Sequence, residues 1–227
     1  MMYLTRIQLD PSRRLAQKYL GSPQVMHAVV MKAAGDTSHE GPGRVLWRVD
    51  HGYSQTTLYF LTPNEPDCEQ ILQEAGDIGI PSRTVDYMPF LNKLREGDTW
   101  AFRLCANPTR AVSHDGSSRG KIHTHVTVSH QADWLLSKAP DIGIRIVPSL
   151  GNEDEPSIRV TQRNRRRFGR KDPFTNDRGT VTIGSVVYEG ALEVTDVSKI
   201  RLALINGIGR SKAYGCGLMT LAQMQRS

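Results

Sequence analysis

The chain has 227 residues, of which 38% are hydrophobic and 23% charged, an ordinary composition for one large globular domain or two small ones. It contains no run of 18 apolar residues, which excludes a membrane-spanning helix, so we expect no membrane partner. The N-terminus lacks the apolar core of a secretory signal. Three widely spaced cysteines, Cys68, Cys105 and Cys216, form neither a disulfide framework nor a metal motif, and we expect a cytoplasmic protein.

Basic charge is concentrated in one segment. Residues 159–171, RVTQRNRRRFGRK, hold seven basic side chains and no acidic one, whereas the net charge of the whole chain is +6. The rest of the chain is therefore close to neutral. Charge gathered in one place indicates a specific binding site for a polyanion.

The first half alternates strand-like and helix-like segments. Ser22-Pro23 is a strong helix start, and the helix that it opens, residues 24–34, ends at Gly35. A second helix is predicted over 66–75. Apolar alternation predicts strands over 3–9, 44–50, 56–61 and 99–106. This order, βαββαβ, is that of a ferredoxin-like unit.

A polar stretch, SHDGSSRG at 113–120, follows, and we interpret it as a linker between domains at 1–112 and 121–227. The second half repeats the order of the first, with helices over 131–139 and 197–205 and strands over 144–149, 157–162, 180–194 and 218–221. The basic segment is a hairpin inserted between two of these strands. We predict an α+β protein of two tandem ferredoxin-like domains.

The C-terminal segment 207–217, GIGRSKAYGCG, is rich in glycine. A dinucleotide-binding fingerprint is excluded because only ten residues follow it, and the spacing of a Walker loop is absent. Two interpretations remain. The loop is either a tight turn before the last strand or a backbone that approaches phosphates, through Gly207, Gly209, Gly215 and Gly217, with charge from Arg210 and Lys212.

Several pieces together resemble the CasE family, the repeat-RNA endoribonucleases of the type I-E Cascade complex within the repeat-associated RNA-binding proteins. They are MYLTRIQL (2–9) followed by Met26-His27, FRLCANPTR (102–110), VVYEGALEV (186–194) and NGIGRSKAYGCGL (206–218). The resemblance implies binding of a CRISPR repeat stem-loop and one cut at the 3′ base of the stem without a metal or other cofactor. It also implies that the mature guide RNA stays bound beside other Cascade subunits.

By this resemblance, His27 is the catalytic group. A histidine titrating near neutrality serves as general acid or base when a 2′-OH attacks the adjacent phosphate. Lys32 is a candidate phosphate cation, although it lies about 140° around the helix from His27. Gln24, where some members have Tyr, is a weaker candidate for positioning the phosphate. Cys105 stands where the motif usually has Arg.

The basic hairpin is expected to grip the RNA, since arginine binds phosphates through paired hydrogen bonds; its alternative is a solvated loop that becomes ordered only on RNA. No metal site is expected, because His123 and His125 lack a third ligand and residues 153–155 read as a solvated acidic loop. A non-catalytic stem-loop-binding subunit is the alternative function. The predicted hairpin contacts are Arg159, Arg163, Arg165, Arg166, Arg167, Arg170 and Lys171.

Overall fold

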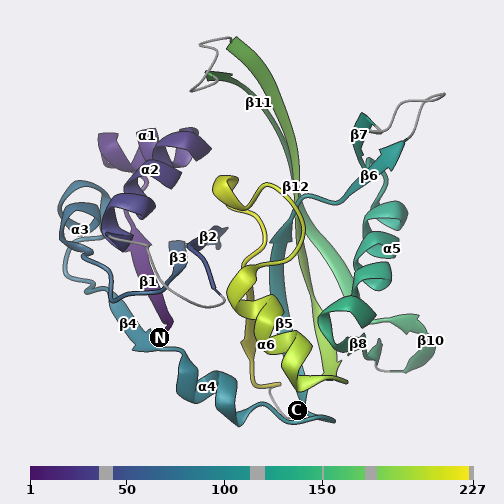
Figure 1. Ribbon diagram of the computed structural model, residues 1–227. Coiled ribbons are helices and arrows are strands. Elements are labelled where there is room, and N and C mark those ends of the chain that lie inside the picture. The colour runs from purple at the N-terminus through teal and green to yellow at the C-terminus, as the bar shows by residue number, and fades with distance from the viewer. Residues whose placement is uncertain (36–42, 113–120, 150, 172–177, 225–227) are drawn as a thin grey trace.

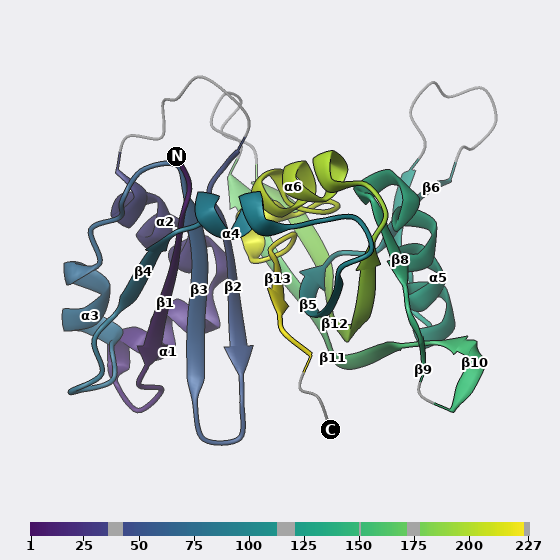
Figure 2. The same ribbon diagram turned by 90° about the horizontal axis from the view of Figure 1, so that it is seen from below.

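A computed structural model describes residues 1–35, 43–112, 121–149, 151–171 and 178–224. Its N-terminal unit is a four-stranded antiparallel sheet with the order β2-β3-β1-β4 and helices packed on one face (Figure 2). This is the predicted βαββαβ unit. Its elements are β1 (Tyr3–Leu9), α1 (Arg14–Gly21), α2 (Pro23–Ala34), β2 (Leu46–His51), β3 (Thr56–Thr62), α3 (Glu69–Ala75) and β4 (Arg83–Asp86).

The strand at Thr99–Ala106, β5, belongs to the second sheet, where it lies between β12 and β13. The prediction that it completes the first unit is wrong. Its place is taken by β4, a four-residue edge strand whose sequence RTVD shows little apolar alternation. The two sheets therefore divide between Asp86 and Thr99, across α4 (Met88–Lys93), and not at residue 112.

The second sheet has the order β11-β12-β5-β13, and β8 pairs with the far end of β12. It is again a βαββαβ arrangement, with β8 and β11 sharing one edge of β12. Its elements are β5, α5 (Val128–Lys138), a short helix η1 (Pro140–Ile142), β8 (Ile144–Ile146), β11 (Ile158–Lys171), β12 (Arg178–Val194), α6 (Val197–Asn206) and β13 (Met219–Ala222). No helix among the described residues is long and apolar enough to cross a membrane.

Three smaller features complete the second unit. β6 (Thr109–Val112) pairs with β7 (Lys121–Thr124), so the predicted linker at 113–120, which lies outside the described residues, connects two strands of one hairpin. β9 (Pro148–Ser149) pairs with β10 (Asn152–Pro156), so the predicted acidic loop is a short strand. A helical turn, η2 (Lys212–Tyr214), lies in the glycine-rich loop.

The basic hairpin is the continuation of two sheet strands. β12 pairs with β5 from Val186 to Glu193, but its pairing with β11 runs on to Lys171 and Arg178. Beyond Val186 the two strands therefore leave the sheet and rise between the N-terminal helices and the β6–β7 hairpin (Figure 1). The predicted hairpin is confirmed. Its described part contacts the N-terminal unit on one side and the chain after β7 on the other.

The two units share a core. Leu46 and Leu61 of the first sheet belong to the same buried cluster as Leu104 and Leu218 of the second unit. Arg48 of β2, only 1% exposed, crosses this seam and donates to the carbonyl oxygens of Arg103 and Leu218 at 2.8 and 3.0 Å. The units are thus held together by a continuous apolar core and a buried charged contact.

Candidate active site and RNA-binding surfaces

His27 lies early in α2, where the sequence predicted it. Ser22 caps this helix by accepting a hydrogen bond from the Val25 amide, and Pro23 fills its first position. The His27 side chain is half-buried, and its Nδ1 has no hydrogen-bond partner among the described residues. Burial and the nearby positive charge of Arg44 both lower the pKa of His27. At neutral pH the imidazole is therefore uncharged and able to accept a proton.

Arg44 acts electrostatically on His27, and a second cation, Lys212, lies in a turn that packs against the same helix; neither is on α2. Arg44 precedes β2, and its amide donates to Ile205 O at 3.1 Å, which ties this segment to the C-terminal end of α6. Lys212 lies in η2, which packs against α2. Burial and the charge of Arg44 lower the pKa of Lys212. Because Arg44 influences both groups, His27, Arg44 and Lys212 share one electrostatic neighbourhood, which we call the His27 cluster.

The glycine-rich loop is built for close packing. Gly207, Gly209, Gly215 and Gly217 all have positive φ. A Cβ added to Gly207 would lie 2.6 Å from a Leu46 methyl carbon, and one added to Gly215 would lie 2.8 Å from the Trp47 ring. These glycines therefore let the loop approach β2 and bring Lys212 to α2, which supports the tight-turn interpretation. Gly209 and Arg210 are exposed, and contact of the loop with RNA remains a prediction.

Lys32 and Gln24 point to different surroundings. Lys32 is exposed and lines a groove between α2 and α3 together with Asp67 and Glu69, a groove that His27 does not line. The structure therefore does not bring Lys32 to the His27 cluster. This agrees with its position about 140° around the helix from His27. Gln24 instead contacts the basic hairpin, because its Nε2 donates to Gly169 O at 2.9 Å.

The arginines of the hairpin divide between two faces. The pairing of β11 with β12 is regular from Gln162 to Lys171, so alternate side chains point to opposite sides. Arg166 faces the N-terminal unit and donates to Leu20 O at 3.3 Å, and the Phe168 ring meets the Tyr214 ring edge to face, with 5.0 Å between their centroids. Arg163 faces the other way and donates to Val126 O. The prediction of one arginine finger is therefore refined to two basic surfaces.

The remaining predicted hairpin contacts differ in position, because Arg165 and Arg167 alternate onto the same face as Arg163 whereas Arg159 lies farther along β11. Arg159 is exposed in the part of β11 that belongs to the sheet, 3.9 Å from a Glu189 oxygen. Arg165 and Arg167 are exposed. The side chains of Arg170 and Lys171 lie outside the described part of the chain.

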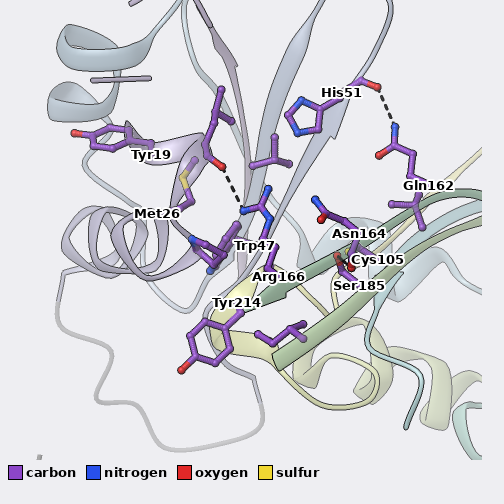
Figure 3. Close-up of a pocket in the computed structure, with 16 residues that line it drawn as sticks. Tyr19, Met26, Trp47, His51, Cys105, Gln162, Asn164, Arg166, Ser185 and Tyr214 are labelled. Atoms are coloured by element: carbon purple, nitrogen blue, oxygen red, sulfur yellow. Dashed lines mark hydrogen bonds between the residues drawn. The ribbon is translucent and has the colours of Figure 1, made fainter. Parts of the chain in front are cut away.

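A narrow cavity of about 90 Å³ lies at the seam beside the inner face of the hairpin (Figure 3). Arg166, Asn164 and Tyr214 line it, as does His51, whose carbonyl accepts from Gln162 Nε2 at 3.3 Å. Cys105 also lines it and lies against Cys216. At the position where the family motif has Arg, this chain therefore places a small buried thiol.

Comparison with known proteins assigns the chain to a family. A family model described as CRISPR associated protein matches residues 2–223. The chain belongs to this CRISPR-associated family. It is 30% identical to CRISPR-associated endoribonuclease Cse3 of Thermus thermophilus over 223 residues, 97% of this chain and 100% of the relative. The resemblance to CasE is thereby confirmed.

Solved structures agree with this assignment. A structure of CRISPR endoribonuclease Cse3 bound to 19 nt RNA has a TM-score of 0.77 at 28% identity and covers 97% of this chain and 99% of its own. Thermus thermophilus Cse3 bound to an RNA representing a pre-cleavage complex has a TM-score of 0.75 at 26% identity, covering 97% and 98%. Cas6e of Escherichia coli K-12, at 18% identity and TM-score 0.55 over 99% of this chain and 100% of its own, shares the fold.

One member of the His27 cluster and one aromatic contact of this CRISPR-associated protein could not be predicted from its sequence. Arg44 is a single arginine at the start of a predicted strand, with no local signal. Tyr214 and Phe168 meet only because the glycine-rich loop and the hairpin converge. The predicted pair of His123 and His125 also lacked a neighbouring histidine. The His125 ring lies 5.9 Å from that of His130, in the first turn of α5.

Proposed function

We propose that the chain is a metal-independent endoribonuclease that cuts CRISPR precursor RNA at the 3′ base of the repeat stem-loop. It leaves 2′,3′-cyclic phosphate and 5′-hydroxyl ends and stays bound to the mature guide RNA within Cascade. A relative named as an endoribonuclease, and a similar structure bound to a pre-cleavage RNA, support this proposal. The observation that carries it is the His27 cluster, in which half-buried His27 lies on a helix that packs against the turn holding Lys212 and contacts the basic hairpin through Gln24, with Arg44 acting on both His27 and Lys212.

The cluster suits cleavage by an internal nucleophile. Neutral His27 takes the proton from the 2′-OH, whose oxygen then attacks the adjacent phosphorus. Negative charge builds up on the phosphate oxygens, and Lys212 and Arg44 stabilise it because they are fixed before the reaction begins. The 5′-oxygen leaves as its bond to phosphorus breaks, and Lys212, with its lowered pKa, supplies a proton to it.

A labelled repeat stem-loop incubated with the protein in EDTA tests this function. A second RNA carries a 2′-deoxy residue at the cut site. Cleavage of the first RNA alone is the expected result, because only it holds the nucleophile. Cleavage of both, or dependence on an added metal ion, would contradict the proposed mechanism.

One observation favours a second candidate, a stem-loop-binding subunit that does not cut. Gln24 stands where some CasE members have Tyr, and its amide is engaged with the hairpin at Gly169 O. A protein of this kind would bind both RNAs of the EDTA experiment and cut neither.

Substitutions of Lys212 and of Lys32 distinguish the site seen in the structure from the site predicted from the sequence. We expect Lys212→Ala to lower single-turnover cleavage by about 10²-fold, since it removes a fixed cation beside His27. Lys32→Ala changes cleavage by less than about twofold, as is usual for an exposed residue away from a site. The reverse order of effects would place the phosphate in the α2–α3 groove instead.

The pH dependence of cleavage follows from the same two groups. The rate rises with pH as His27 loses its proton, and the midpoint of this rise lies below the usual histidine pKa of about 6.5 because the pKa of His27 is lowered. It falls again as Lys212 loses its proton, at a pH below the usual lysine pKa of about 10.4. Single-turnover rates measured with buffers of constant ionic strength check both limbs. A rate that falls steadily from acidic to neutral pH would show that His27 acts only as an acid.

The salt dependence of binding tests both hairpin faces. Each phosphate contact lowers affinity by about 0.7–0.9 log units per log unit of salt. The triple variant Arg165→Ala, Arg166→Ala and Arg167→Ala is therefore expected to flatten the slope by about two units or more. Equilibrium binding of the 2′-deoxy stem-loop over a salt series measures it, and an unchanged slope would remove the hairpin from the RNA interface.

A further inference from the structure

A second, larger hollow lies on the outer face of the hairpin, away from His27. Its lining residues come from β11, β12, α5, the end of β7 and the chain that follows β7, and Figure 1 shows where these elements lie. Its volume is about 790 Å³, within the range of pockets that hold a ligand the size of a nucleotide. We call it the lateral groove, and the side chains that define it are His123, His125, Gln131, Arg163, Arg165 and Ser185.

The lateral groove combines positive charge with aromatic rings. Arg163 and Arg165 are both exposed on its wall, and the side chains that line it within the described ranges include no acid. The His125 ring lies 5.9 Å from that of His130, and His125 also lines the groove. Arginine binds phosphate, and imidazole and guanidinium planes stack on unpaired bases.

Gln131 adds a buried polar side chain to the lining of the groove. It is 3% exposed, and its Nε2 donates to His125 O at 2.9 Å, which fixes the amide. Its Oε1 has no hydrogen-bond partner among the described residues. A buried acceptor of this kind is costly unless something binds it. The amino group of a base is a donor of suitable chemistry.

Backbone packing holds the groove open in its present shape. A Cβ on Gly184 of β12 would lie 2.4 Å from the Thr124 methyl carbon, so the absence of a side chain at Gly184 lets Thr124 pack directly on the hairpin. Arg163 Nη2 donates to Val126 O on the same wall. The groove is therefore built by contacts between three separate elements, and is not a gap beside a free loop.

We propose that the lateral groove holds an unpaired nucleotide of the RNA, with its base beside His125 and Gln131 and its phosphate at Arg163 and Arg165. This inference rests on the proposed function. A concave pocket fits a base that has left a stack, whereas a duplex would meet only the rim.

The strand that supplies this nucleotide follows from the two faces of the hairpin. In the proposed complex the inner face, with Arg166, meets the 3′ strand that is cut near His27. The outer face then meets the opposite strand at the base of the stem. The nucleotide in the lateral groove therefore lies on the 5′ side of the stem, in the part of the RNA that remains with the protein after cleavage.

The experiment measures the affinity gained from single-stranded RNA outside the stem. The probes are the 2′-deoxy stem-loop alone and the same RNA with a short single-stranded extension at its 5′ end or its 3′ end. For wild type we expect about tenfold tighter binding with the 5′ extension, the effect of about one stacked base, and no such gain with the 3′ extension. In the variant His125→Ala/Arg165→Ala, the gain drops below about twofold and affinity for the bare stem-loop falls much less than affinity for the extended RNA.

Arg145→Ala is the matched control, because it removes an exposed arginine of the same sheet that pairs with Glu193 at 2.6 Å outside the groove; it should keep the full gain. The single variant Arg165→Ala repeats the test if the double variant unfolds. Equal affinity of wild type for bare and extended stem-loops, or a gain that survives in the variants, overturns the proposal. If this test fails while wild type still cuts the bare stem-loop with its 2′-OH intact, only the groove proposal is overturned. If wild type neither binds nor cuts that RNA, the proposed function fails as well.

Discussion

Replacing His27 by alanine is expected to slow cleavage of the repeat stem-loop by about 10²–10⁴-fold, the usual contribution of a general base. The affinity for RNA should stay close to that of wild type, since the uncharged imidazole contributes no ionic contact with phosphate. His27 is half-buried rather than part of the core, so the fold tolerates the change. Single-turnover cleavage and equilibrium binding of the 2′-deoxy RNA, measured on the same preparation, test both parts.

Two results would change the interpretation of His27, and a third would support it. Cleavage at the wild-type rate would remove it from the reaction and leave Lys212 as the group to examine. Loss of binding together with cleavage, accompanied by a lower melting temperature, would make it a structural residue. Unaltered binding with cleavage lost in His27→Ala but retained in Lys32→Ala would place the chemistry on the face of α2 that meets the glycine-rich loop.

The parts of the site that sequence could predict are those with local physical causes. Ser22-Pro23 starts α2 because the Ser22 hydroxyl caps a free backbone amide and Pro23 has no amide hydrogen that would need a partner. This start fixes the place of His27 in the first turns of the helix. The basic hairpin follows from a dense run of arginine between two β-patterned segments. Its division into two faces was also available from the sequence, because Arg165 and Arg166 must point apart in any extended strand.

The parts that sequence could not predict depend on contacts between distant segments. Arg44 acts on Lys212 because the chain before β2 is hydrogen-bonded to the end of α6, which leads into the glycine-rich loop. β5 belongs to the second sheet because its long apolar strand pairs with β12 and β13, whereas the short polar β4 occupies the edge of the first sheet. Neither outcome has a local signature, since pairing partners are chosen by the whole core.

Arg48→Ala is expected to lower the free energy of unfolding by about 3–5 kcal/mol, the usual cost of removing one partner from a buried charged network. All five N–H groups of Arg48 are used. They reach both oxygens of Asp50 at 2.7 and 2.9 Å, the Arg103 and Leu218 carbonyls, and Thr220 Oγ1 at 2.9 Å. The variant removes this donor from the Arg103 and Leu218 carbonyls at the seam and leaves Asp50 with its contact to Arg103 Nε at 3.2 Å. Urea unfolding monitored by circular dichroism gives the free energy.

The surface pair of Arg145 and Glu193 provides the comparison, because Arg145 is 65% exposed at its side chain and such pairs contribute about 0–1 kcal/mol. If Arg48→Ala costs no more than Arg145→Ala, the seam is held by its apolar core alone. The expected loss has a functional side as well. Arg48 binds the carbonyl of Leu218, the residue that follows Gly217, and it lies on the strand that Arg44 precedes. It therefore joins the two segments that bring Lys212 and Arg44 to His27, and under conditions where Arg48→Ala is still folded, cleavage should fall more than affinity for the stem-loop.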